Sequence, residues 1–161
     1  MMGCGKSTVG ARLAQKMNRE YVDTDSVIVE RYGQIADIFE QYGEAYFRDL
    51  ETETVRELVQ KEELVIATGG GLVLKQENVE LLKTGGRIIF LRANLETLTE
   101  RLQSDTERPL LQNAESLRVR LGKLLKDRAP MYEGVADLIL EVDQKTPEQI
   151  ADEIIKWIGQ V

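Results

Sequence analysis

The sequence predicts an α/β fold of three layers, in which a central parallel sheet is covered by helices on both faces. Two segments, residues 64–67 and 88–91, are entirely apolar and too short for helices, which is typical of strands buried on both faces. Helical patterns separate these strands, as in sheets whose parallel strands are joined by crossover helices. The third observation is a glycine-rich turn at the start of the chain, directly before the first helical pattern.

Helices and strands alternate along the chain. The first helix begins near Lys6, because Val9, Leu13 and Met17 recur every four residues. Four strands and several helices follow. In order we expect a strand at 20–24, helices at 26–32, 35–41 and 44–60, a strand at 64–67, a helix at 79–83, a strand at 88–91, helices around 95–102 and 117–125, a strand at 138–142, and a last helix.

Several residues mark where helices begin and end. Gly33 is a suitable residue to end the helix at 26–32, and Asn94 is a suitable N-cap for the helix that follows it. Thr146, Pro147 and Gln149 open the last helix with an N-cap, a proline at its first position and a capping-box glutamine. No repeat or linker interrupts this series, so residues 1–161 are expected to form one domain.

Composition excludes several classes of function. The chain has 21 Lys and Arg against 28 Asp and Glu, a net charge of −7, which argues against a nucleic-acid partner. No apolar run reaches the roughly 18 residues of a membrane span, so we expect a cytoplasmic protein without membrane contact. The absence of histidine, with Cys4 as the single cysteine, excludes Ser-His-Asp and Cys-His catalysis, histidine metal sites and an internal disulfide.

Residues 3–8, GCGKST, match the end of the phosphate-loop pattern G-x-x-x-x-G-K-[ST]. Glycines let backbone N–H groups turn toward a phosphate, and the following helix adds its positive end. Lys6 would reach the outer phosphates, and the Ser7 hydroxyl would bind Mg²⁺. The predicted nucleotide-binding set here is Gly3, Cys4, Gly5, Lys6, Ser7 and Thr8, with Cys4 at a position that the pattern leaves free.

The loop pattern lacks its first glycine, which would lie one residue before Met1. The strand that normally leads into such a loop, and that lies in the centre of a doubly wound sheet, is missing with it. We therefore expect a P-loop NTPase fold whose first central strand is absent from the given chain, with a start truncated within the loop.

A carboxylate pair follows the first predicted strand. Asp23 and Asp25 are two residues apart around Thr24, at the strand end. The two carboxylates are expected to have different roles.

Further motifs follow in a fixed order, and together they resemble the shikimate kinase family over nearly the whole chain. They are Asp23-Thr24-Asp25, Phe47-Arg48 with Glu51, Thr68-Gly69-Gly70-Gly71, Arg108-Pro109-Leu110-Leu111, and Arg128 followed by Pro130 and Tyr132. A phosphate loop alone is shared by many nucleotide-using families, whereas this ordered set is specific.

The resemblance implies an acceptor site. Asp25 would contact the acceptor hydroxyl of shikimate as the candidate base, and Asp23 would lie near Mg²⁺ and its waters. Arg48 and Arg128 would hold the carboxylate, since a planar guanidinium can pair with both of its oxygens. Glu51, three residues after Arg48 on a helix, could orient it. The backbone of Gly69, Gly70 and Gly71 would approach the substrate ring, with Gly70 in contact.

The resemblance also implies roles around the nucleotide. Arg108 would lie on a lid at about residues 104–113 and stabilise charge on the transferring phosphoryl group. Arg101 and Lys145 match positions near adenine. The segment at about 26–60 would form a helical substrate-binding part beside the nucleotide-binding core.

These expectations together describe an ATP-dependent, Mg²⁺-requiring enzyme, acting as a monomer, with Lys6, Asp25 and Arg108 in catalysis. It would convert shikimate to shikimate 3-phosphate on the path to chorismate and aromatic amino acids. The alternatives are another small-metabolite kinase of the same fold, of the gluconate type or acting on nucleoside monophosphates, and a non-catalytic binding remnant.

Overall fold

The computed structural model describes residues 2–103 and 114–160, so the segment predicted as a lid, with Arg108, lies outside the described residues. The α/β class is confirmed, and each predicted helix and strand in the described part has a counterpart. The elements are α1 (Lys6–Met17), β1 (Glu20–Asp23), α2 (Thr24–Tyr32), α3 (Ile35–Leu58), β2 (Leu64–Ala67), the 3₁₀ turn η1 (Leu72–Leu74), α4 (Gln76–Gly85), β3 (Ile89–Arg92), α5 (Leu95–Gln103), α6 (Ala114–Val135), β4 (Leu138–Glu141) and α7 (Pro147–Ile158).

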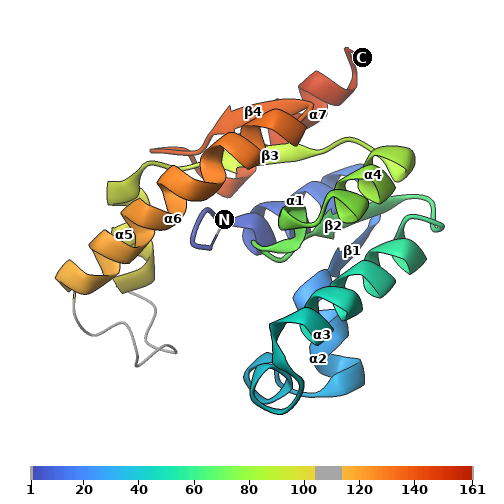
Figure 1. Ribbon diagram of the computed structural model, residues 1–161. Coiled ribbons are helices and arrows are strands. Elements are labelled where there is room, and N and C mark those ends of the chain that lie inside the picture. The colour runs from blue at the N-terminus through green and yellow to red at the C-terminus, as the bar shows by residue number, and fades with distance from the viewer. Residues whose placement is uncertain (1, 104–113, 161) are drawn as a thin grey trace.

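The strands form two parallel pairs. β1 pairs with β2 from Glu20↔Leu64 to Asp23↔Ala67, and β3 pairs with β4 from Ile89↔Leu138 to Arg92↔Glu141. Among the described residues no pairing joins β2 to β3. In Figure 1 the amino-terminal end of the chain lies between the two pairs. The sheet is thus divided at the position where a doubly wound fold would have a central strand.

The main apolar core surrounds the β3–β4 pair. Helix α1 packs against β1, β2 and α7, and α5 packs against α6. The buried side chains of this cluster come from all these helices and from the second strand pair; they include Val9, Leu98, Leu121, Val142, Ile150 and Ile154. This packing fixes the start of α1, and with it the glycine-rich loop, relative to the ends of the strands.

A second, smaller apolar cluster lies between α2 and α3. Its buried members are Ile28, Ile38, Phe47 and Leu50. In Figure 1 these two helices lie together at one end of the molecule, below the strands. Since the cluster buries residues directly next to Arg48, it holds in place the helix face that carries this arginine.

Several predicted boundaries differ from the structure; the helices expected at 79–83 and 117–125, for example, are longer. Two of the differences lie near the cleft. The helices expected at 35–41 and 44–60 are one element, α3, with a break at Gly43, whose φ of 82° and ψ of 172° are not helical. Thr24, expected to end the first strand, instead begins α2. The cause is the Asp23 carboxylate, whose Oδ1 accepts hydrogen bonds from the backbone N–H groups of Asp25 and Ser26 and so caps the helix.

None of the helices within residues 2–103 and 114–160 is long and apolar enough to cross a membrane.

Candidate active site

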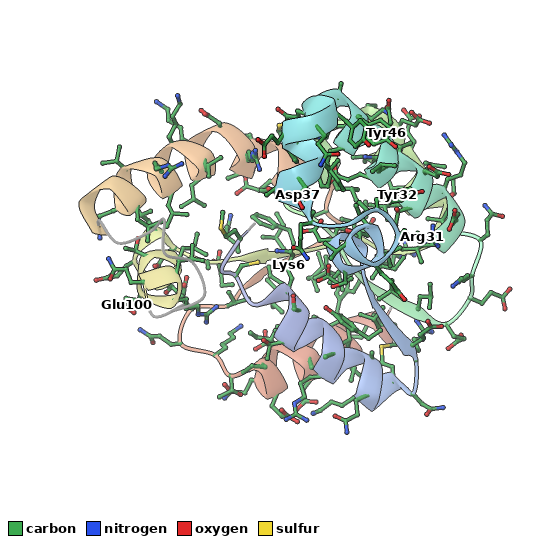
Figure 2. The ribbon with its side chains drawn as sticks, turned by 90° about the horizontal axis from the view of Figure 1, so that it is seen from below. Lys6, Arg31, Tyr32, Asp37, Tyr46 and Glu100 are labelled. Atoms are coloured by element: carbon green, nitrogen blue, oxygen red, sulfur yellow. The ribbon has the colours of Figure 1, made fainter. Side chains whose placement is uncertain are left out.

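A cleft of about 710 Å³ runs from the glycine-rich loop to the start of α2 and the face of α6. It brings together residues that are far apart in the sequence, from Met2 to Tyr132. Of the predicted site residues it is lined by Gly3, Gly5, Lys6, Ser7, Thr8, Asp23, Asp25, Gly70, Gly71, Arg101 and Arg128. In Figure 2 Lys6 lies near the centre of the view, where α1 begins, whereas Glu100 and Tyr46 lie toward the periphery.

The glycine-rich loop has the backbone that a phosphate cradle requires. Gly3 and Gly5 have φ angles of 77° and 91°, in the left-handed region that side chains disfavour. Gly5 is the N-cap of α1, so no side chain caps this end, and the first turn of α1 carries no acidic residue. Arg101 donates to the Gly3 carbonyl at 3.5 Å. The loop therefore presents backbone donors to the cleft, and the basic side chains of Lys6, at the start of α1, and Arg101, on α5, line it beside the loop.

Cys4 differs from the rest of the loop. Its side chain is 1% exposed and belongs to the main apolar core. It lines a smaller cavity of about 50 Å³ that borders β3, instead of the main cleft. In the described structure Cys4 thus packs the loop onto the core.

Asp23 connects the loop with α2. Its Oδ2 accepts hydrogen bonds from the Ser7 hydroxyl at 3.3 Å and the Tyr21 hydroxyl at 3.4 Å, while its Oδ1 caps α2. Burial, with the nearby Asp23 carboxylate as a smaller contribution, raises the pKa of Tyr21. One carboxylate thus fixes Ser7 relative to Asp25, which lies in the first turn of α2.

Asp25 and Glu51 meet at Gly69. A Cβ at Gly69 would lie 2.6 Å from Asp25 Oδ1 and 3.0 Å from Glu51 Oε1, so the absence of a side chain is required here. The Gly69 N–H donates to the Thr24 hydroxyl at 2.9 Å, and Thr24 is fully buried. Glu51 is 1% exposed, and burial raises the pKa of its carboxyl group although Arg48 opposes the shift.

Arg48 is held by two glutamates of its own helix. Its Nη1 donates to Glu51 Oε2 at 2.7 Å, and its Nη2 donates to Glu44 Oε1 at 2.8 Å. The pairing with Glu51 is the one that the three-residue spacing predicts. The guanidinium also lies against Gly71, where a Cβ would be 2.6 Å from Nη2. Arg48 therefore reaches the cleft wall at Gly71.

Arg128 reaches the same glycine segment from α6. Its Nη1 donates to the Gly70 carbonyl at 3.4 Å, and the Tyr132 hydroxyl, one turn further along α6, donates to the same oxygen. Burial raises the pKa of Tyr132. The glycine segment is thus fixed by α2, α3 and α6 together.

Besides Cys4, three described residues of the predicted set do not line the cleft: Arg48 and Gly69, which border it at Gly71 and Asp25, and Lys145. The Nζ of Lys145 pairs with Glu153 at 2.7 Å. Arg108 falls outside the described residues. Sequence reasoning in turn missed the roles of Thr24, Tyr21 and Glu44, and it used Tyr132 only as part of a motif. The four-residue spacing of Glu44 and Arg48 is the one local signal that points to a pairing.

Comparison with known proteins supports one family. The shikimate kinase family model matches residues 2–159. A shikimate kinase of Sulfurihydrogenibium sp. is 43% identical over 158 residues, 98% of this chain and 93% of the relative. One of Thermodesulfovibrio yellowstonii is 44% identical over 156 residues, 96% of this chain and 89% of the relative.

Solved structures agree with the sequence relatives. Shikimate kinase from Acinetobacter baumannii in complex with shikimate has a TM-score of 0.89 at 39% identity, covering 99% of this chain and 89% of that one. The enzyme from Bacteroides thetaiotaomicron has a TM-score of 0.90 at 31% identity, covering 98% and 94%. The chain belongs to the shikimate kinase family.

Proposed function

We propose that Lys6, Asp25, Arg48 and Arg128 carry, in this chain, the reaction of its family, the ATP-dependent phosphorylation of the 3-hydroxyl of shikimate. The observation that carries this assignment is the single cleft in which a phosphate loop faces Asp25, Gly70 and Arg128. A phosphoryl donor bound at one end and a hydroxylated acid at the other would meet in line between Lys6 and Asp25. Positioning and charge neutralisation supply most of the rate in such transfers.

The nucleotide end uses backbone and lysine. The N–H groups at the start of α1 and the left-handed glycines Gly3 and Gly5 are suited to the β- and γ-phosphates of ATP. Lys6 neutralises charge on the transferring group, and Arg101, which contacts the Gly3 carbonyl, covers the base side. Arg108, which the resemblance places on the phosphoryl group, stays a prediction.

The residues present fit a magnesium ion. The Ser7 hydroxyl and Asp23 carboxylate are 3.3 Å apart, and both line the cleft. Mg²⁺ usually keeps several waters and takes few protein ligands, so one hydroxyl and one carboxylate are enough to hold it. Ser7 would bind the ion directly and Asp23 would bind its waters; the ion supplies further neutralisation of phosphate charge.

The acceptor end uses Asp25 and two arginines. Asp25 accepts the proton of, or orients, the 3-hydroxyl, while the guanidinium groups of Arg48 and Arg128 bind the carboxylate of shikimate. The ring lies against Gly69, Gly70 and Gly71, whose lack of side chains leaves room for it. We expect the chain to act as a monomer. A cytoplasmic location and the absence of a nucleic-acid partner also stay predictions.

Measurement of ADP release with shikimate, gluconate and nucleoside monophosphates tests the assignment. We expect turnover with shikimate and little with the other acceptors. Faster release with gluconate would make the gluconate-type alternative correct. Shikimate binding without ADP release would make the chain a binding remnant.

The arginine pair gives a sharper test of the acceptor end. Arg48→Lys and Arg128→Lys should each weaken shikimate binding by about 1–3 kcal/mol, because lysine keeps the charge but loses the planar fork. ATP affinity should stay near that of the unmodified protein. Arg56→Lys is the matched control, since Arg56 lies on α3 and pairs with Glu77. A loss confined to ATP binding would place Arg48 and Arg128 at the wrong end of the cleft.

A further inference from the structure

The donors of Arg48 are not equally available to a ligand. A guanidinium offers five N–H groups along two edges that suit a carboxylate, Nε with Nη2 and Nη1 with Nη2. The Nη1 side is closed, because Glu51 accepts from Nη1 at 2.7 Å and Gly71 lies directly against Nη1 and Nη2. The edge that remains for an incoming carboxylate is therefore the one formed by Nε and Nη2.

Glu44 occupies this remaining edge. A single oxygen, Oε1, accepts from Nε at 3.3 Å and from Nη2 at 2.8 Å. Both donors of the edge converge on one acceptor, which is a weaker arrangement than a carboxylate with one oxygen on each donor. Glu44 therefore occupies the edge in a form that a ligand carboxylate can improve on.

The two glutamates differ in exposure. The Glu51 side chain is 1% exposed, so removing its partner would leave a buried charge. The Glu44 side chain is 63% exposed, so it can rotate into water, and exposed ion pairs contribute little. Glu44 is also the first residue after the break at Gly43, at the open end of the helical segment that carries Arg48. Glu51 is the fixed partner of Arg48, and Glu44 is the exchangeable one.

We propose that Glu44 is a competitor built into the acceptor site, whose carboxylate holds the Nε and Nη2 edge of Arg48 until the carboxylate of the acceptor replaces it. The inference rests on the proposed function, since it takes Arg48 as a ligand of the shikimate carboxylate. Glu44 lowers the affinity for every acceptor and favours those that present two oxygens in one plane. It also keeps Arg48 paired when no acceptor is bound.

Titration calorimetry with shikimate and with shikimate methyl ester, both without nucleotide, tests this exchange. Glu44→Gln should bind shikimate about 2- to 5-fold more tightly than the unmodified protein, the range that loss of an exposed ion pair gives. Glu44→Ala should tighten binding at least as much. The methyl ester, which lacks the charged carboxylate, should gain nothing from either change.

Glu53→Gln is the matched control, because Glu53 is exposed on the same helix, two residues beyond Glu51 and on another face. It removes the same charge and should leave the dissociation constant for shikimate unchanged. Weaker or unchanged shikimate binding in Glu44→Gln, or equal tightening in Glu53→Gln or with the ester, overturns the inference while leaving the proposed function intact. If the unmodified protein neither binds nor phosphorylates shikimate, both are overturned.

Discussion

Helices α1 and α7 begin in opposite ways. At α7 the Thr146 hydroxyl accepts from the Gln149 N–H at 3.3 Å, the Gln149 side chain accepts from the Thr146 N–H at 2.8 Å, and Pro147 and Glu148 fill the first turn. At α1 the N-cap is Gly5, with neither a capping side chain nor an acid in the first turn. The N-terminus of α7 is thus capped by the chain's own groups, whereas the N-terminus of α1 is left for an outside anion. Helix α4 also lacks a capping side chain and has Lys75 as its N-cap, but its first turn carries Glu77. An uncapped start beside a lysine, with no acid in the first turn, therefore points to the nucleotide site better than the glycines alone.

The largest expected effect comes from Lys6, the lysine at the uncapped start of α1. Lys6→Met should reduce ADP release by about 100- to 1000-fold, as loss of one charge-stabilising donor does elsewhere. Lys16→Met, which removes a lysine of the same helix that pairs with Asp152, should retain turnover. Equal activity in the Lys6 variant and the unmodified protein would remove the loop from the mechanism.

A strand placed ahead of the loop should have the next largest effect. Fusing six to nine apolar residues that end in glycine before Met1 should raise both melting temperature and ATP affinity. The described edges of β2 and β3 have no strand between them, and each large apolar side chain buried there contributes roughly 1.5–3 kcal/mol. A glycine-serine extension of equal length is the control. If both extensions melt alike, the loop is held by α1 and its core contacts alone.

A smaller effect is expected when α1 is given an acidic first turn. Thr8→Glu should weaken ATP binding about tenfold, roughly 1.4 kcal/mol, because the carboxylate competes with phosphate for the helix end. The same change should stabilise the nucleotide-free protein by about 0.3–1 kcal/mol. Titration with ATP measures the loss of affinity, and urea unfolding measures the gain in stability. Thr8→Gln is the control for side-chain size. A variant that loses ATP affinity and stability together would show damage to the loop instead.

The smallest effect is expected at the capped start of α7. Thr146→Ala removes the N-cap of α7 and should lower the free energy of unfolding by about 1 kcal/mol. The dissociation constant of ATP should not change. Urea unfolding and nucleotide titration check both statements, and a clear loss of ATP affinity would mean that α7 supports the site more directly than its capping suggests.

Local patterns explain which features could be predicted from the sequence. The apolar period of α1, the Asn94 side chain that accepts from Thr97, and the capping box of α7 all lie within a few residues. Nearest-neighbour chemistry decides such features, so one sequence suffices. Thr24 was misplaced because its strand propensity competes with the Asp23 cap, and the cap prevails.

Features that depend on distant residues were less accessible. The contact of Arg128 with Gly70 spans 58 residues, and that of Gly69 with Thr24 spans 45. The sequence resemblance pointed to these arginines and glycines but not to the contacts between them. For Lys145 the resemblance indicated a position near adenine, but it did not indicate the ion pair with Glu153 that the structure has.

The tight contacts at Gly69 and Gly71 constrain how this chain can change over generations. An alanine at position 71 would push the Arg48 guanidinium away from Glu51, and one at position 69 would displace Asp25. A shorter side chain at position 48 would make room at 71 but would leave Glu51 buried without its counter-ion. No single one of these substitutions keeps both the Arg48–Glu51 pair and the close contact at Gly71. Among descendants of this sequence, positions 48, 51 and 71 should therefore change together or not at all.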